Sequence, residues 1–518
     1  MSIREPESSP VSKSSTAPTA DRTAWWVALA ATVVSVVAYW YFASKGMALG
    51  YKDSISHLQI AARTLSSPTA GFAQLGGVWL PLPHILMLPL AWYAPFYYSG
   101  FAGSAISMVS YVVTCVYVYK LSFGLTRSKL PALSGLGVFA LNPNVLYMQS
   151  TPMTELLLFA CIAAMAFYVQ RWAQTEEHLQ KYPYLFAAAM AAFLACLTRY
   201  EAWPLLLVTG ATVVIIAWRQ YGRHAATGVA TGFAFFAGAS IVLWLGWNLL
   251  IFGNPLNFQN GEYAKPSLWV HESEVAVGDP VVSAQTYWYA VVENLGLAVV
   301  IAMIIGAVAL ILRRRLDSLP VLALLTVAPF FVVALAVGQR PLHVMQISQD
   351  LYNVRFGLLM VVPAAVLIAY LVSLLPTRAG FVALGVAFAA TLSPLIPNGP
   401  TAVVTATEGN KGFPATAVEA SGYLSTHYDG GVVLIESFGN ESVLFHARIP
   451  LSKNVYEGSY QKWDPALSSP PGQGIRWIVM RGGVEPDETY RDLMGSPKLA
   501  EYAEVFRNKE YAVYKAED

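Results

Sequence analysis

Residues 25–42 read "WWVALAATVVSVVAYWYF", and residues 51–65 read "YKDSISHLQIAARTL". The first stretch is apolar, has aromatic residues at both ends, and approaches the ~20 residues that a helix needs to cross a bilayer. The second stretch has apolar residues at helical spacing and begins beside one acidic residue, Asp53. Together they predict a membrane span followed by an amphipathic helix just outside the membrane.

Similar apolar stretches recur along the chain, at about 100–121, 130–147, 153–172, 182–198, 202–218, 228–251, 287–312, 319–337, 355–375 and 379–396. The chain is 56% hydrophobic and 12% charged, whereas soluble domains are about 25% charged. The mean hydropathy is +0.49. The sequence therefore predicts an α-helical polytopic membrane protein with about eleven transmembrane helices. It excludes a disordered, collagen-like or disulfide-stapled chain.

Net charge and cysteines exclude two further classes of function. The 32 basic and 31 acidic residues leave a formal charge of +1, so nothing in the bulk charge favours nucleic acid as a partner. Cys115, Cys161 and Cys196 all lie in apolar runs and have no metal-ligand spacing. They are best interpreted as small buried hydrophobic residues.

Loop charge sets the predicted orientation. Residues 80–95 ("LPLPHILMLPLAWYAP") are apolar but short and contain four prolines. If this segment crossed the membrane, Arg313, Arg314 and Arg315 would face outward, against the positive-inside rule. The segment is therefore predicted to lie along the outer face, within a first outer loop at 44–99. The amino terminus is then cytoplasmic, the carboxyl terminus lies outside, and the location is a plasma or inner membrane.

Three regions follow from this pattern. Residues 1–23 are rich in Ser, Pro and Thr and predict a disordered cytoplasmic tail. Residues 24–396 form the transmembrane domain. Residues 397–518 mix polar and apolar residues and predict a small extracytoplasmic α/β domain, with strands at 432–437 and 475–482 and helices near 415–427 and 485–494.

The polar residues gather in four loops that this topology places on the outer face, namely 51–84, 142–155, 198–203 and 339–357. Ionisable groups beside spans are costly and usually functional, so four such loops favour one shared site. Asp53 is either a general base or the N-cap of the amphipathic helix. Arg355 either binds a phosphate, or pairs with Asp350 or extends to the lipid headgroups.

The other candidates have structural alternatives as well. Arg199 is either a phosphate ligand or a structural partner of Glu155 or Glu201. Glu155 is either part of the site or a first-turn carboxylate in a helix capped by Thr151. Tyr352 lies near Arg355 in the sequence.

The remaining candidates are histidines and loop aromatics. His57, His84 and His343 are either packing or hydrogen-bonding side chains or, with Asp53 and Glu155, part of a divalent-cation site. The loop aromatics either anchor the membrane interface or stack on sugar rings; they are Trp79, Tyr147, Tyr200 and Trp203. No Walker A, dinucleotide or zinc-helix motif occurs. An outer-face enzyme without a nucleotide pocket needs an already activated, lipid-linked donor.

At these motifs the chain resembles the GT-C superfamily of polyprenyl-phosphate-sugar-dependent glycosyltransferases. The resemblance is greatest to the branch of protein O-mannosyltransferases and lipid A aminoarabinose transferases. It covers residues 24–396 as architecture, with "YKDSISHLQIAARTL", "LPLPHILMLPL", "PMTE", "TRYEAW" and "YNVRFGLLMVVP" as motifs. It implies that Asp53 is the catalytic carboxylate and that Arg355 contacts the donor phosphate. Where many members have a second acid, this chain has Ser54.

The resemblance implies inverting transfer of a sugar from a polyprenyl-phosphate carrier to an acceptor hydroxyl. Asp53 would be the base, and Arg355, with Arg199 or Arg340, would stabilise the leaving phosphate. No cofactor is required, although Mg²⁺ or Mn²⁺ bridged by Asp53 and Glu155 is an alternative. The expected partners are the lipid-linked donor, the bilayer and a lipid, glycan or protein acceptor. The rival functions are a secondary transporter or lipid flippase and a non-catalytic scaffold.

Overall fold

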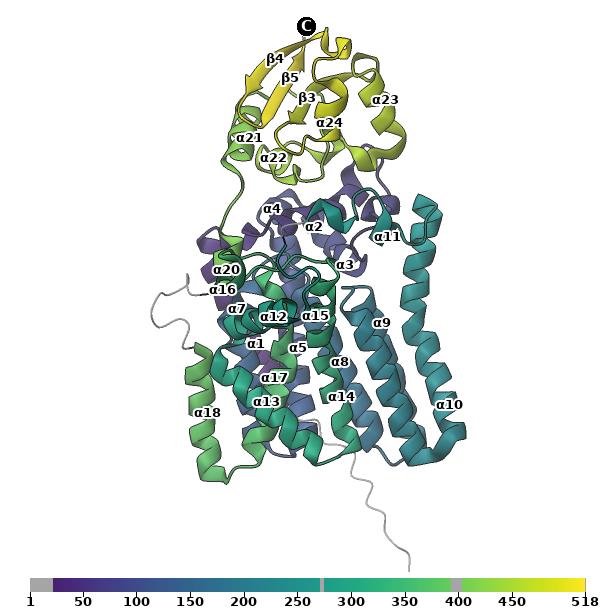
Figure 1. The fold of residues 1–518 in the computed structure, drawn as a ribbon, viewed down its shortest axis with the longest axis vertical. Helices are drawn as coiled ribbons and strands as arrows, with labels where there is room; N and C mark the ends of the chain where they lie inside the picture. The colour runs from purple at the N-terminus through teal and green to yellow at the C-terminus, as the bar shows by residue number, and fades with distance from the viewer. Residues whose placement is uncertain (1–21, 271–273, 393–402, 518) are drawn as a thin grey trace, which may run out of the picture.

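The computed structural model describes residues 22–270, 274–392 and 403–517. The predicted tail at 1–23 and the predicted boundary between 396 and 397 fall almost entirely outside these residues, so both stay predictions. Figure 1 shows a bundle of long helices with a small sheet at one end, which confirms the predicted fold class. We call this end of the bundle the sheet-facing end.

The bundle is built from helices that coincide with the predicted apolar stretches. Their bounds are α1 Arg22–Ser44, α5 Phe101–Thr126, α6 Lys129–Ala140, α7 Pro143–Met148, α8 Glu155–Gln174, α9 His178–Cys196, α10 Ala202–Phe252, α12 Pro280–Leu295, α13 Leu297–Leu312, α14 Leu319–Ala323, α15 Val327–Ala336, α17 Val361–Ser373 and α18 Thr377–Leu392. In the most apolar part of α8, 78% of the residues are buried, against 28% in α1 and 22% in α10. The centre of the bundle is therefore α8 together with the segment that ends in α17, and α1 and α10 lie at its edge.

Helix α10 is a hairpin of two limbs that turns at Gly222. This residue has φ 82° and ψ 179°, a conformation that is essentially restricted to glycine. The hydroxyl of Tyr200 accepts a hydrogen bond from Trp244 Nε1 at 3.0 Å. A straight helix would place residues so far apart in sequence ~66 Å from each other, at 1.5 Å per residue. The predicted spans at 202–218 and 228–251 are thus antiparallel neighbours.

The number of crossings is lower by helix length than the sequence predicts. Among the described residues, six helical segments are long and apolar enough to cross a membrane, or seven if α12 and α13 form one span. This count takes α10 once, although it has two limbs. Helices α12 and α13 meet at an angle of 109°, so the apolar stretch predicted at 287–312 contains two helices rather than one. Gly296, with φ 85°, forms the bend between them. The counts differ for two reasons. Some predicted stretches form helices that are too short to cross a membrane alone, such as α6, and α10 covers two of the eleven predicted stretches.

The proline-rich segment forms short helices at the sheet-facing end (Figure 1). It comprises α3 (Leu82–Ala91) and α4 (Ala94–Tyr98), beside the amphipathic helix α2 (Lys52–Ser66). A ten-residue helix is ~15 Å long, half of the ~30 Å hydrocarbon core. Helix α3 is therefore too short to cross by itself.

The carboxyl-terminal region contains a five-stranded sheet in the order β2-β1-β3-β5-β4. The strands are β1 Val432–Leu434, β2 Asn454–Val455, β3 Ile475–Arg481, β4 Tyr502–Arg507 and β5 Tyr511–Ala516; the helices are α21 Ala415–His427, α22 Glu441–His446, α23 Trp463–Ser468 and α24 Glu488–Leu493. Strands β2, β1 and β3 are parallel, and β3, β5 and β4 are antiparallel. Alternate residues of β3 enter two different cores, as strand geometry requires: Trp477 enters one and Ile478 the other. The two predicted strands and two predicted helices are present as β1, β3, α21 and α24, whereas the other strands and helices were not predicted.

The sheet region docks on the first loop of the bundle through α2 and the residues that follow it. Gln59 Nε2 donates to the carbonyl of Glu441 at 2.7 Å, and Gln74 Nε2 donates to the carbonyl of Gly458 at 2.8 Å. Both acceptors lie in segments that follow the carboxyl ends of parallel strands, β1 and β2. These ends therefore face the sheet-facing end of the bundle, where the polar loops lie.

Candidate active site

The structure brings the four predicted polar loops together at the sheet-facing end of the bundle. Asp53 comes from α2, Glu155 from the start of α8, Arg199 from the turn between α9 and α10, and Arg355 from the 3₁₀ segment that leads into α17. Direct contacts between their side chains, given below, connect all four loops. Residues up to 302 positions apart thus form one cluster.

Arg355 is the centre of this cluster. Its Nη2 lies 2.6 Å from Asp53 Oδ2, its Nε 3.1 Å from Glu155 Oε1, and its Nη1 3.4 Å from Glu408 Oε1. Its side chain is only 7% exposed. The alternative pairing with Asp350 is wrong, because Asp350 binds Lys411 instead. One guanidinium therefore balances three carboxylates.

Asp53 lies at the edge of the cluster and stays accessible. Its side chain is 39% exposed, and no described residue hydrogen-bonds its Oδ1. The N-cap interpretation is wrong: Tyr51 is the N-cap of α2, and Asp53 lies one residue into the helix. A carboxylate in the first turn is still stabilised by the helix dipole. Asp53 is thus fixed through one oxygen and open at the other.

Glu155 and Arg199 form the buried side of the cluster. Arg199 Nη1 lies 2.9 Å from Glu155 Oε1, and its Nη2 lies 2.7 Å from Glu201 Oε1, so both structural pairings occur at once. The same Glu155 oxygen also contacts Arg355. The predicted cap by Thr151 is wrong, because Thr154 precedes α8 and the Thr151 hydroxyl donates to the carbonyl of Met148. Glu155 is fully buried, so it joins two arginines rather than facing a substrate.

Glu408 is a cluster residue that sequence reasoning missed. It lies on α20 (Val404–Gly409), a short helix in the connection to the sheet. Its carboxylate accepts hydrogen bonds from the backbone N–H groups of Asn353 and Val354 and from the Tyr51 hydroxyl. Burial raises the pKa of this carboxyl, while Arg355 opposes the shift. No periodicity marks Glu408 in the sequence, since α20 is too short to carry a pattern.

Arg340 differs from the other site arginines in having no partner. It is half-buried, and no described residue forms a hydrogen bond or ion pair with its guanidinium. Burial lowers its pKa, with Glu201 acting in the opposite direction. An unpaired, partly buried guanidinium is a ready site for an anion.

Asp53, Arg199, Arg340 and Arg355 line a cavity of about 600 Å³ between the bundle and the sheet. One face of α2 runs along it, with Asp53, Ser56, His57, Ile60 and Arg63 as lining residues. The bundle also contributes Trp79, Arg199, Tyr200, Glu201, Arg340, Tyr352, Arg355 and Phe356. The sheet region contributes Ser437, Phe438, Glu441, Tyr456, Glu457, Gly458 and Tyr460.

Two of the three predicted histidines, His57 and His84, contact each other, whereas His343 lies elsewhere. His57 Nδ1 lies 2.9 Å from His84 Nε2, and the Trp79 ring lies against His57 with centroids 4.3 Å apart. Burial, with Arg199 and Arg355 nearby, lowers the pKa of His57 to about 3, so this imidazole is neutral. His343 instead contacts Glu274 at 2.9 Å and does not itself line the cavity, although its backbone pairs with that of Tyr352, which does.

The predicted cation site does not fit the side chains that would form it. Asp53 and Glu155 both contact Arg355, whose positive charge takes the place that a cation would need. The described part of the chain brings together no group of three or more His, Cys, Asp or Glu side chains suited to a metal. We therefore assign no step to a metal ion.

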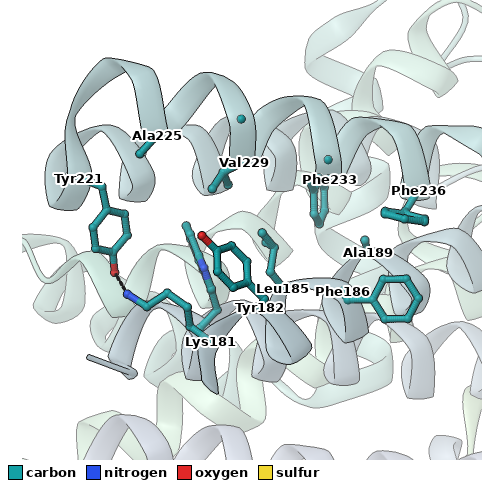
Figure 2. Close-up of a pocket in the computed structure, with 13 residues that line it drawn as sticks. Lys181, Tyr182, Leu185, Phe186, Ala189, Tyr221, Ala225, Val229, Phe233 and Phe236 are labelled. Carbon is teal, nitrogen blue, oxygen red and sulfur yellow. Dashed lines mark hydrogen bonds between the residues drawn. The ribbon is translucent and has the colours of Figure 1, made fainter. Parts of the chain in front are cut away.

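A second cavity, of about 610 Å³, lies between α9 and the second limb of α10. Figure 2 shows its mostly apolar lining, with Leu185 and Phe186 on one helix and Val229 and Phe233 on the other. Its polar contact joins Lys181 Nζ to the Tyr221 hydroxyl at 2.7 Å. No carboxylate lines it, so it lacks the groups that the reaction predicted from the sequence requires.

Comparisons with known proteins identify the architecture. No protein-family model and no curated protein matches the chain. Among solved structures, ArnT from Cupriavidus metallidurans bound to undecaprenyl phosphate is 12% identical, with a TM-score of 0.56 over 96% of this chain and 98% of that chain. The same protein in the apo state gives 12% identity and a TM-score of 0.53 over 95% and 98%. The apo oligosaccharyltransferase of Archaeoglobus fulgidus gives 12% identity and a TM-score of 0.50 over 89% and 70%. The chain thus shares its fold with ArnT over nearly its whole length, which agrees with the architecture that the sequence resemblance implies.

Proposed function

We propose that the protein is an integral-membrane glycosyltransferase that moves a sugar from a polyprenyl-phosphate carrier to an acceptor hydroxyl. The observation that carries the proposal is the Asp53 carboxylate, which Arg355 holds through one oxygen at the edge of a cavity lined by four arginines. The fold shared with ArnT, which was crystallised with undecaprenyl phosphate, supports a lipid-phosphate donor.

Asp53 acts as the general base. Its Oδ2 is held by Arg355, and its free Oδ1 takes the proton of the acceptor hydroxyl. The hydroxyl oxygen forms a bond to the anomeric carbon as the bond between that carbon and the phosphate oxygen breaks. The electron pair of the broken bond stays on the phosphate, and this single displacement inverts the anomeric centre.

Arg340 is the first ligand of the departing phosphate. Arg355 and Arg199 are each engaged by carboxylates, so a phosphate would have to displace those contacts. Arg340 has no such contact to give up, and its positive charge stabilises the phosphate more strongly as negative charge develops there. Arg355 then serves mainly to position Asp53, which differs from the role that the family resemblance implies.

We also propose that the sheet-facing end lies outside the cytoplasm. The turn of α10, near Arg219 and Arg223, and the Arg313–Arg315 run after α13 lie at the other end of the bundle (Figure 1). Such an asymmetry of positive charge favours a cytoplasmic location for that end. The protein is then a multi-pass protein of the plasma or inner membrane.

The decisive experiment measures release of free polyprenyl phosphate from a polyprenyl-phosphate sugar labelled in the sugar. We expect the purified protein in detergent or nanodiscs to release it and to move the label to an acceptor. A transporter or flippase would instead move the intact lipid between leaflets of a proteoliposome and release no phosphate. Lipid movement without cleavage would therefore contradict the proposed enzyme.

A further inference from the structure

The cavity has a second end, about one and a half nanometres from Asp53, that the reaction above does not use. Asp53 and Arg63 both line the cavity from the same helix. Ten residues of α-helix separate them, which corresponds to ~15 Å at 1.5 Å per residue. This length exceeds one sugar ring, so the Arg63 end is available to a group other than the sugar in transfer.

Arg63 is held at this end without an ion pair to any described residue. Its Nη2 donates to Gln59 Oε1 at 2.9 Å and to Ser437 Oγ at 2.5 Å, and its guanidinium stacks on the Tyr456 ring at 3.9 Å. The residue is only 8% exposed, and its buried Nε has no hydrogen-bond partner in the described chain. A buried donor without a partner costs free energy, which a bound ligand can recover.

The segments that follow the carboxyl ends of the parallel strands β1 and β2 cover the Arg63 end of the cavity. Ser437 and Phe438 come shortly after β1, and Tyr456 and Glu457 come directly after β2. The Glu457 carboxylate accepts the backbone N–H groups of Ser437 and Phe438 at 2.6 and 3.0 Å, which joins the two segments. In open α/β sheets, ligands bind outside the carboxyl ends of the strands. The sheet thus presents its usual binding edge to the cavity.

We infer that the Arg63 end is the acceptor subsite and that its ligand is a hydroxyl-rich, uncharged or cationic glycan; this inference rests on the proposed glycosyl transfer. The lining combines aromatic rings with carboxyl groups: Tyr263, Phe438, Tyr456 and Tyr460 with Glu262, Glu441 and Glu457. Aromatic rings pack on the apolar faces of sugars. Carboxylates and a guanidinium form strong hydrogen bonds to sugar hydroxyls.

Two other acceptor classes fit this lining less well. At the Arg63 end, a phosphorylated lipid headgroup would lie beside the carboxyl groups of Glu262, Glu441 and Glu457 as well as beside Arg63. An extended peptide binds by adding a strand to a sheet edge, but the edge strand beside the cavity, β2, is two residues long. A glycan needs neither an anion site nor a strand edge.

The test uses the full-length protein in detergent on an array of neutral and amino oligosaccharides, with a phosphorylated glycolipid and a Ser/Thr-rich peptide on the same surface. We expect binding to a set of the oligosaccharides and a loss of at least about tenfold in affinity in both Arg63→Lys and Glu457→Gln. Lys keeps the charge of Arg63 but lacks the planar group that stacks on Tyr456. Glu504→Gln, the same substitution on the distant strand β4, is the matched control and should bind like the unaltered protein.

The thermal midpoint of each variant in detergent shows whether it is folded, and Tyr456→Phe provides a second, milder change. Absence of oligosaccharide binding, preference for the peptide or the phosphorylated lipid, or equal affinity in the folded variants would each overturn the glycan subsite. Glycan binding by a protein that cleaves no lipid-linked sugar would overturn the proposed function and leave the subsite standing.

Discussion

Asp53 shares Arg355 with Glu155 and Glu408, and this sharing determines what a substitution at Asp53 does. Asp53→Asn keeps the size of the side chain and one oxygen for Arg355, and the other two carboxylates still hold the guanidinium. The amide cannot accept the acceptor proton, so transfer should fall by about 10²–10⁴-fold, the usual contribution of a general base. Transfer of labelled sugar measures this, with an unchanged thermal midpoint as the control. Near-normal turnover in the folded variant would contradict the mechanism.

Substitution of Arg340 should weaken donor binding, whereas substitution of Arg355 should mainly lower the stability of the protein. Arg340→Ala removes an unpaired donor, so donor binding should weaken by about 1.5–3 kcal/mol, and Arg340→Lys should recover part of that. Arg355→Ala leaves the buried carboxylates of Glu155 and Glu408 without their partner, so it should lower the thermal midpoint strongly. Equilibrium binding of the lipid-linked donor and thermal unfolding measure the two effects. If Arg355→Ala stays folded and loses donor affinity while Arg340→Ala keeps it, then Arg355 rather than Arg340 is the phosphate ligand.

The sequence predicts the members of this cluster better than their contacts. Four loops rich in polar residues were enough to predict a shared site, because each contained an ionisable group beside a span. The partners of Arg355 were not predictable, since Asp53, Glu155 and Glu408 lie between 53 and 302 positions away from it. Only the fold brings them together. Local rules also misled: they favoured Asp53 and Thr151 as caps, where the backbone places Tyr51 and Thr154.

At the scale of single elements, the turn of α10 depends on one backbone conformation. Gly222 has φ 82° and ψ 179°, which a residue with a Cβ can adopt only with strain of about 1–3 kcal/mol. Gly222→Ala should therefore lower the thermal midpoint. Gly210→Ala is the matched control, because Gly210 lies inside the first limb with open space around it, and alanine favours a helix there. Equal effects of the two substitutions would show that the hairpin does not depend on Gly222.

The carboxyl of Glu436, two residues after the end of strand β1, should make stability depend on pH through its titration. Burial raises the pKa of Glu436 to about 7, and nearby Asp487 adds to the shift. The folded protein therefore binds this proton more tightly than the unfolded chain. Its contribution to stability is complete below the ordinary glutamate pKa and is lost as the pH rises through 7. The thermal midpoint should fall between pH 5.5 and pH 8, and Glu436→Gln should reduce this dependence and be the more stable protein at pH 8. Glu501→Gln, an exposed control, should keep the slope of the unaltered protein; an equal slope in Glu436→Gln would assign the dependence to other groups.

At the scale of the whole molecule, composition predicts the class and periodicity predicts the elements, but neither predicts how the sheet meets the bundle. Apolar runs locate the helices, and the short β-type run at 475–482 locates β3. The cavity arises where Gln59 and Gln74 of one loop bind carbonyls of the sheet region more than 380 positions away. Single hydrogen bonds of this kind leave no periodic signal. The bend between α12 and α13 was missed for a similar reason, because an apolar run has the same composition whether it is straight or bent.

The orientation of the molecule in the membrane decides whether the cavity can bind its donor, because the sugar of a lipid-linked donor is displayed on one side of the membrane. A reporter fused after Asp518 should report the outer side, and one inserted in the 219–223 turn should report the cytoplasm, since positive charge gathers at that end. Substituted-cysteine labelling gives an independent measurement: a cysteine at the exposed Glu504 should react with a membrane-impermeant maleimide in intact cells, and one at Arg219 should react only after lysis. Cys115, Cys161 and Cys196 are buried and should give little background. An inside location for Asp518 with a reactive Arg219→Cys would place Asp53, Arg340 and the whole cavity in the cytoplasm, and a donor displayed on the outer leaflet would then be out of reach.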